Sequence, residues 1–250
     1  MVTPNTYAHY KCNDDAANTV VTDDGSGANN GVSSTNTANL SIVGKINDAF
    51  DFVEASSEYI GIDALSTDIA SDATGSIAMW LKPNAASGTH QMFSIADTSE
   101  RSALFCFLDG VDLSIYIFKN ATNSAKWIQP GVITTNWQHV VFVQDGVSLK
   151  VYYNGVDITE ATPTLEGDAA VSVWLSYGTN IDNGTIGVRN YRGLGNQEYF
   201  DGGLDDIRYY KAVLTQQDVH NLYRGGVGTE DDPPDFFSTG FPHSQGFIIS

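Results

Sequence analysis

The sequence predicts an all-β sandwich, and three features of the chain support this prediction. Short apolar or alternating runs recur throughout the chain and are bounded by Gly, Asn, Asp and Ser. Helical periodicity is nearly absent. Asp-Gly and Asn-Gly pairs separate neighbouring runs, as tight turns in hairpins require. At 250 residues, the chain is long enough for one β domain with its own core.

Several strands are expected in the first half of the chain. Residues 7–12 form the first strand, and a loop rich in Gly, Asn and Asp follows at 23–31. Residues 49–52 and 59–62 alternate like half-buried strands. The segment 76–82 is apolar on both faces, which predicts a central strand that is covered on both sides.

Hairpins are expected in the second half of the chain. Each hairpin joins two apolar runs through a turn that contains glycine, because glycine accepts a positive φ at little cost. The expected pairs are 103–108 with 113–118 across Asp109-Gly110, and 137–143 with 149–153 across Asp145-Gly146, followed by a further turn at Asn154-Gly155.

One helix is expected, over residues 215–223. Thr215 caps it, Asp218 has the spacing of a capping box, and Gly225 ends it. Beyond this helix, residues 227–235 contain a Pro-Pro pair and are expected to form an extended linker. The tail 236–250 is apolar, so it either folds over the sandwich as a flap or docks on a neighbouring subunit.

Five blocks of the chain carry a family resemblance, which extends over about residues 7–226. They are Ala49-Phe50-Asp51-Phe52, Ser76 to Pro83, Trp137-Gln138-His139, Leu149 to Gly155, and Phe200 to Tyr210 with the capped helix after it. In this order they resemble laminin-G-like domains of the concanavalin A-like superfamily. The resemblance implies a jelly-roll β-sandwich of two antiparallel sheets with one short C-terminal helix, in a domain 1–226 followed by a linker and tail, 227–250. It also implies a module that binds glycans or proteins, since only some branches of this fold are enzymes.

The charge balance and the cysteines narrow the class of protein. The chain has 30 acidic and 12 basic residues and a net charge of −18, so it repels phosphate backbones and is not expected to bind nucleic acid. No apolar run approaches the length of a membrane span, and the chain as given does not begin with a signal peptide. Cys12 and Cys106 lie in strand-like segments and are expected to be buried thiols, with one disulfide between them left as an alternative.

The sequence gives little support for catalysis. Glycosidases of the family that the chain resembles carry two Glu residues around an Asp on one strand, and this pattern does not occur. Glu54 and Glu58 flank an expected turn, so we expect them to be solvated. His139 occupies the structural Trp-x-His position of the resemblance and is expected to be a half-buried histidine with satisfied hydrogen bonds. We therefore expect a protein that is not an enzyme.

A structural Ca²⁺ site is a hypothesis that the resemblance raises. Asp205 matches the aspartate that precedes the last strand in related jelly rolls, and Asp206 lies beside it. Asp23, Asp24 and Asn30 in the first loop could add the oxygen ligands that Ca²⁺ takes. In the alternative, Asp205 and Asp206 shape a turn and pair with Arg208.

A glycan-binding surface is expected in residues 174–200, which combine aromatic rings with Asn, Asp and Arg. The candidate ligand-binding residues are Trp174, Tyr177, Arg189, Tyr191, Arg192 and Tyr199, with Trp127 as a second location. In the alternative, Trp174 and the tyrosines close the rim of the sandwich, and this alternative is favoured for Trp174.

Three functions remain open from the sequence. The first is a non-catalytic carbohydrate-binding or adhesion module on a surface, with a glycan or protein partner. The second is a structural or decorating protein of a phage virion or another assembly, which forms oligomers or docks through residues 236–250. The third is a polysaccharide lyase or hydrolase, which no motif supports. The first two imply an extracellular or virion-surface location.

Overall fold

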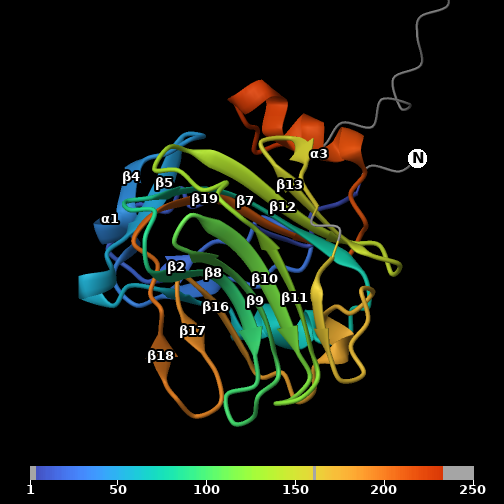
Figure 1. The fold of residues 1–250 in the computed structure, drawn as a ribbon. Coiled ribbons are helices and arrows are strands. Elements are labelled where there is room, and N and C mark those ends of the chain that lie inside the picture. Colours follow the sequence, from blue (N-terminus) through green and yellow to red (C-terminus); the bar gives the residue numbers. More distant parts are fainter. Residues whose placement is uncertain (1–3, 160–161, 233–250) are drawn as a thin grey trace, which may run out of the picture.

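The computed structural model describes residues 4–159 and 162–232. Two large antiparallel sheets stack face to face, and the main core lies between them (Figure 1). This arrangement confirms the predicted jelly-roll sandwich. Within the described residues, no helix is long and apolar enough to cross a membrane.

One layer is an eight-stranded sheet in which β7 and β19 are central. In spatial order its strands are β14 (Val156–Asp157), β13 (Leu149–Tyr153), β12 (Gln138–Gln144), β7 (Gly75–Pro83), β19 (Gly202–Tyr210), β5 (Asp48–Phe52) and β4 (Ser41–Val43), and β1 (Ala8–Tyr10) also pairs with β19. The buried strand β7 lies between β12 and β19, as the run 76–82 predicts.

The other layer is a nine-stranded sheet with β8, β9 and β10 near its middle. Its strands are, in spatial order, β15 (Thr164–Glu166), β11 (Ser124–Gln129), β10 (Asp112–Phe118), β9 (Ala103–Asp109), β8 (Thr89–Ala96), β16 (Asn183–Ile186), β6 (Ile60–Gly61), β3 (Gly31–Ser33) and β2 (Val20–Val21). The predicted Asp109-Gly110 turn joins β9 to β10.

The remaining elements are short. They are the hairpin strands β17 (Arg189–Asn190) and β18 (Asn196–Gln197), the helices α1 (Thr37–Leu40), α2 (Asp63–Ile69) and α3 (Gln216–Tyr223), and the 3₁₀ helices at Glu54–Ser56, Leu175–Tyr177 and Arg224–Gly226. Helix α2, whose Leu65 and Ile69 are buried, was not expected from the sequence.

Helix α3 covers the outer face of the eight-stranded sheet (Figure 1). Its Val219 and Leu222 pack in a second apolar cluster with side chains of β7, β12, β13 and β19. The predicted capping box is present: Asp218 N–H donates to the Thr215 hydroxyl oxygen, and Thr215 N–H donates to the Asp218 carboxylate. The C-terminal signature therefore folds as expected.

Two further predictions can be compared with the structure. Cys12 and Cys106 are both buried and form no disulfide, which confirms the expectation of free thiols. The first residues of the expected linker are held against the domain, because the Arg208 guanidinium donates to the carbonyls of Thr229 and Asp231. The tail 236–250, with its predicted role in docking, lies outside the described residues.

Candidate functional site

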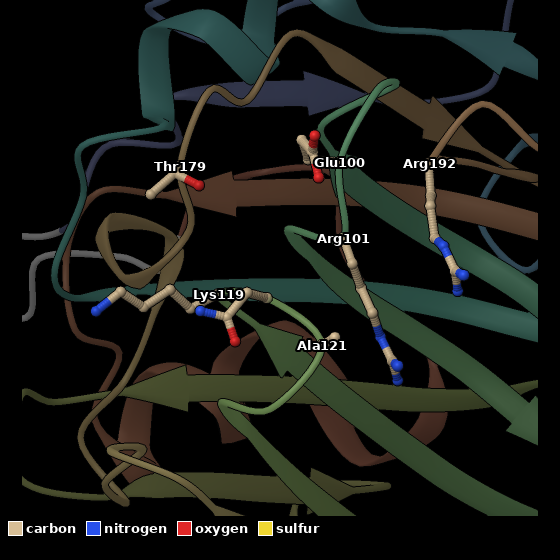
Figure 2. Close-up of a pocket in the computed structure, with 7 residues that line it drawn as sticks. Glu100, Arg101, Lys119, Ala121, Thr179 and Arg192 are labelled. Atoms are coloured by element: carbon tan, nitrogen blue, oxygen red, sulfur yellow. The ribbon is translucent and has the colours of Figure 1, made fainter.

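A shallow pocket of about 440 Å³ lies at one end of the nine-stranded sheet. Four segments meet there: the β8–β9 loop, the β10–β11 loop, and the chain around residues 179 and 192 (Figure 2). The lining residues are Glu100, Arg101, Lys119, Asn120, Ala121, Thr179 and Arg192, and we call this set the rim pocket.

The β8–β9 loop is held by Asp97, which is buried at the end of β8. Its Oδ1 accepts hydrogen bonds from Ser99 N–H at 2.8 Å and from Glu100 N–H at 3.1 Å. These bonds make an aspartate turn of the kind that substitutes a side chain for a backbone partner. These hydrogen bonds therefore fix the backbone of the loop that carries Glu100 and Arg101.

The neighbouring loops are fixed in similar ways. Asn120 Oδ1 accepts from the N–H groups of Thr122 and Asn123, both at 3.0 Å. Thr179 N–H donates to Ser102 Oγ at 2.7 Å, which ties the 178–182 segment to the start of β9. A site built on loops that are already ordered loses less conformational entropy when it binds a ligand.

Arg192 reaches the rim pocket from the β17–β18 hairpin. Its N–H donates to the carbonyl of Asp97 at 3.1 Å, and its φ of 59° is in the left-handed region. For a residue other than glycine this conformation costs about 1 kcal/mol or more and persists where the surrounding structure imposes it. The hairpin is therefore docked on the β8–β9 loop, with Arg192 directed over the sheet.

An aromatic cluster lies on the outer face of the nine-stranded sheet, beside the rim pocket. It contains Ala96, Ala103, Phe105, Phe107, Phe118 and Tyr191, with Tyr116 packed against it, and we call it the outer aromatic cluster. Cationic side chains lie above its rings: Arg101 Cζ is 4.9 Å from the Phe118 ring centroid, and Lys126 Nζ is 5.5 Å from that of Phe107. Charged groups rather than an apolar element thus cover this face.

A comparison of the sequence with models of protein families identifies the family of this chain. It spans residues 54–220 and is described as the concanavalin A-like lectin/glucanases superfamily (Laminin_G_3). The chain belongs to this superfamily. No curated protein sequence matches the chain.

Solved structures of this superfamily fold resemble the chain at low sequence identity. Domain 4 of AbnA, a GH43 extracellular arabinanase from Geobacillus stearothermophilus in complex with arabinotriose, has a TM-score of 0.58 and 18% identity over 91% of this chain and 100% of that one. The Ruminococcus gnavus IT-sialidase CBM40 bound to alpha2,6 sialyllactose has a TM-score of 0.56 and 15% identity over 72% and 96%. NanB sialidase from Streptococcus pneumoniae (K499G mutant) has a TM-score of 0.56 and 17% identity over 68% of this chain and 26% of that one. At these identities the likeness shows the fold.

The two tryptophans that the sequence proposes as ligand-binding residues are core residues in the structure. Trp127 and Trp174 are 2% and 1% exposed and belong to the main core between the sheets. Neither indole presents a face to solvent, so Trp127 does not provide the expected second binding location, and the burial of Trp174 matches the alternative that the sequence favoured for it. Trp174 instead donates through its ring N–H to the Tyr209 hydroxyl at 3.3 Å.

The other predicted ligand-binding residues are divided between the rim pocket and its surroundings. Arg192 lines the pocket, and Tyr191 belongs to the adjoining outer aromatic cluster. Arg189 pairs with Glu198 and lies over the Tyr191 ring at 4.9 Å. The two remaining residues are half-buried: the Tyr177 hydroxyl donates to Asp168, and the Tyr199 carbonyl accepts from His90.

Thr179 lies within the predicted surface 174–200, but five residues of the rim pocket were missed from the sequence: Glu100, Arg101, Lys119, Asn120 and Ala121. They lie in loops between strands that are distant along the chain. The available signal was the Asp97 turn, because Asp-Thr-Ser after a buried strand predicts a fixed loop.

The aspartates of the calcium hypothesis mostly have other partners. Asp23 is buried and accepts from the N–H groups of His9, Gly25 and Asn29 at 2.7 to 2.8 Å. Asp24 is exposed and pairs with Lys11. Across residues 4–159 and 162–232, no three His, Cys, Asp or Glu side chains are arranged to hold a metal ion.

Asp205 and Asp206 lie at a β-bulge in β19 and differ in environment. Asp206 Oδ1 accepts from Arg208 Nε at 2.9 Å and lies 2.7 Å from His9 Nε2. Asp205 Oδ2 accepts from the N–H groups of Lys45 and Ile46, whereas its buried Oδ1 has no hydrogen-bond partner. Burial raises the pKa of Asp205 to about 8. The pairing of Asp206 with Arg208 matches the alternative to metal binding, and the calcium hypothesis stays a prediction.

The structure places the remaining catalytic candidates away from the rim pocket. Glu54 is exposed in a 3₁₀ turn, and Glu58 accepts from Val53 N–H at 2.8 Å. His139 is fully buried rather than half-buried, packs against the Trp80 ring, and has an Nδ1 without a partner. Burial lowers the pKa of His139 to about 4, so the ring is neutral at pH 7 and acts as a core side chain.

Proposed function

We propose that this protein is a non-catalytic carbohydrate-binding module that recognises its ligand at the rim pocket. The observation that carries the proposal is the rim pocket itself: a preformed hollow on four ordered loops, at the end of a lectin-like sandwich. Loops held on a rigid scaffold are where binding residues are usually found.

The number of carboxylate groups in the rim pocket favours binding of a sugar over its hydrolysis. Glycoside hydrolysis needs two carboxyl groups that face each other across the scissile bond, about 5 to 9.5 Å apart. Among the residues that line the rim pocket, Glu100 supplies the single carboxylate. A polar pocket with one carboxylate can hold a sugar by hydrogen bonds without supplying an acid and a nucleophile.

The comparisons support the same proposal. The CBM40 structure is bound to sialyllactose, and the arabinanase domain is in complex with arabinotriose. The structural match covers 96% of the CBM40 chain and 100% of the arabinanase domain. This chain therefore resembles the ligand-bound module in each case. The arabinanase is described as extracellular, and we propose that this chain also acts outside the cell.

A glycan array with the full chain tests this function, run once with Ca²⁺ and once with EDTA. We expect selective binding to a subset of glycans, and the Arg192→Ala variant should lose it while it remains folded. A blank array in both conditions would contradict the proposal.

A further inference from the structure

Five of the 12 basic residues of this acidic chain line the rim pocket or lie over the adjoining outer aromatic cluster. Only 12 basic residues accompany 30 acidic ones. Arg101, Lys119 and Arg192 line the rim pocket, and Lys126 and Arg189 lie over the adjoining outer aromatic cluster. A local positive region on a strongly negative protein attracts anions to that point alone.

Part of this positive charge has no acidic partner. Lys119 Nζ pairs with Asp168 at 3.1 Å, and Arg189 pairs with Glu198 at 2.7 Å. Within the part of the chain that the structure describes, Arg101, Lys126 and Arg192 form no ion pair. The Nε atom of Arg101 is also buried without a hydrogen-bond partner.

No aromatic residue is among those that line the rim pocket, so stacking, the usual means of holding a neutral sugar ring, is not provided by its lining. None of the Trp, Tyr and Phe residues in the described ranges is exposed. The rings of the outer aromatic cluster instead support cations, as Phe118 does for Arg101. A guanidinium on an aromatic face keeps its N–H groups available at its edge.

Figure 2 shows how the cations of the rim pocket are directed. Arg101 and Arg192 come from different loops and extend to the same side, whereas Lys119 extends the opposite way. Thr179 and Asn120 add a hydroxyl and an amide to the lining, and Glu100 is its single acid. Two planar guanidinium groups that line one pocket are suited to a carboxylate or sulfate, which accept paired N–H bonds.

We propose that the ligand is an acidic glycan, whose carboxylate or sulfate is bound between Arg101 and Arg192. This inference rests on the proposed carbohydrate-binding function and specifies its ligand class. Thr179 and Asn120 then contact hydroxyl groups of the same or the next sugar. The net charge of −18 keeps polyanions away from the rest of the surface, so the binding is confined to this pocket.

Calorimetric titration of the full chain with matched polysaccharides tests the inference. The carboxylated pair is polygalacturonate with its fully methyl-esterified form, and the sulfated pair is dextran sulfate with dextran. We expect at least one charged polymer to bind about tenfold or more tightly than its neutral partner, and this preference should decline as salt is raised.

Variants locate the site. Arg101→Ala and Arg192→Ala should each weaken binding of the charged polymer about tenfold or more, because each removes charge-assisted hydrogen bonds. Lys82→Ala is the matched control, since Lys82 is an exposed cation on β7 of the other sheet, and it should leave binding unchanged. Glu100→Gln should tighten binding of the charged polymer by a few-fold, because it removes the single acid that lines the pocket.

The outcomes separate the two proposals. Equal binding of charged and neutral polymers, or binding that survives both arginine substitutions, overturns the acidic ligand but leaves a carbohydrate-binding module. Absence of binding to all four polymers and to the glycan array overturns both. Binding of dextran sulfate without polygalacturonate keeps the inference and assigns the anion as sulfate.

Discussion

The outer faces of the two sheets are covered in opposite ways. On the eight-stranded sheet, α3 buries Val219 and Leu222 against Val141 and Tyr210, so an apolar seal excludes water. On the nine-stranded sheet, the β17–β18 hairpin and cationic side chains lie over the outer aromatic cluster. Burial of apolar side chains under α3 contributes stability, whereas the cationic side chains over the outer aromatic cluster keep N–H donors that face solvent. We call the face covered by α3 the sealed side and the outer face of the nine-stranded sheet the open face. We expect stability to depend mainly on the sealed side and the proposed binding to depend on the open face.

The C-terminal segment extends the sealed side. Arg208 is 1% exposed and pairs with the buried Asp206, while its Nη atoms donate to the carbonyls of Thr229 and Asp231. The Thr6 hydroxyl also bonds to Asp232. One buried arginine therefore connects the last strand to the chain that follows α3.

Arg208→Ala should have the largest effect on stability. The substitution leaves Asp206 buried beside His9 without its main counter-charge, which typically costs about 3–5 kcal/mol. Urea unfolding followed by tryptophan fluorescence measures this loss. Arg192→Ala is the matched control on the open face, and a change within about 0.5 kcal/mol is expected for it. Equal losses in the two variants would contradict the division between the faces.

Tyr191→Ala should affect both stability and binding. Its ring is 8% exposed, packs edge-on against Phe105 with centroids 5.0 Å apart, and lies beneath Arg189. Removing it should cost about 2–4 kcal/mol through the cavity left behind, and should also weaken binding of the charged polymer, because Arg192 follows directly. Tyr191→Phe keeps the ring and should preserve both properties. Unchanged binding in Tyr191→Ala would show that Arg192 is positioned without the aromatic cluster.

Local sequence signals predicted the sealed side well. The doubly apolar run of β7 could only be a covered central strand, and the Thr215–Asp218 spacing indicated the capping box of α3. The Asp-Gly and Asn-Gly pairs located turns that join adjacent strands. Each of these features depends on residues within about ten positions of one another.

The residues of the open face could not be predicted from local sequence, because they come together only through the order of the strands. Arg101, Lys119, Thr179 and Arg192 meet only because β8, β9, β10 and β16 are adjacent in the sheet. Strand register decides the rest, since a shift of one residue exchanges the two faces of a strand. In β11 the register directs Trp127 into the core and Lys126 outward, so the aromatic residue that looked suited to a ligand is buried.

Asp205→Asn should have the most restricted effect on stability, because the effect depends on pH. The pKa of Asp205 rises from 3.8 to about 8 on folding, so between these values the folded state holds a proton that the unfolded state does not. The contribution is fully present below about pH 4 and is lost as pH rises through about 8. The amide oxygen that the substitution introduces can still accept from the N–H groups of Lys45 and Ile46. The variant should therefore be more stable than the wild type at pH 8.5, and its stability should depend less on pH between pH 5 and 8.

The same variant decides the calcium hypothesis, because a bound cation reverses the sign of the result. In metal-free buffer without Ca²⁺, Asp205→Asn should melt at the higher temperature at pH 8.5. If Ca²⁺ binds at Asp205, adding it should raise the melting temperature of the wild type and leave the variant unchanged, since a neutral amide loses the charge that attracts the ion. A wild-type melting temperature that does not respond to EDTA or Ca²⁺ would reject the metal site and leave Asp205 as a protonated acid within the sealed side.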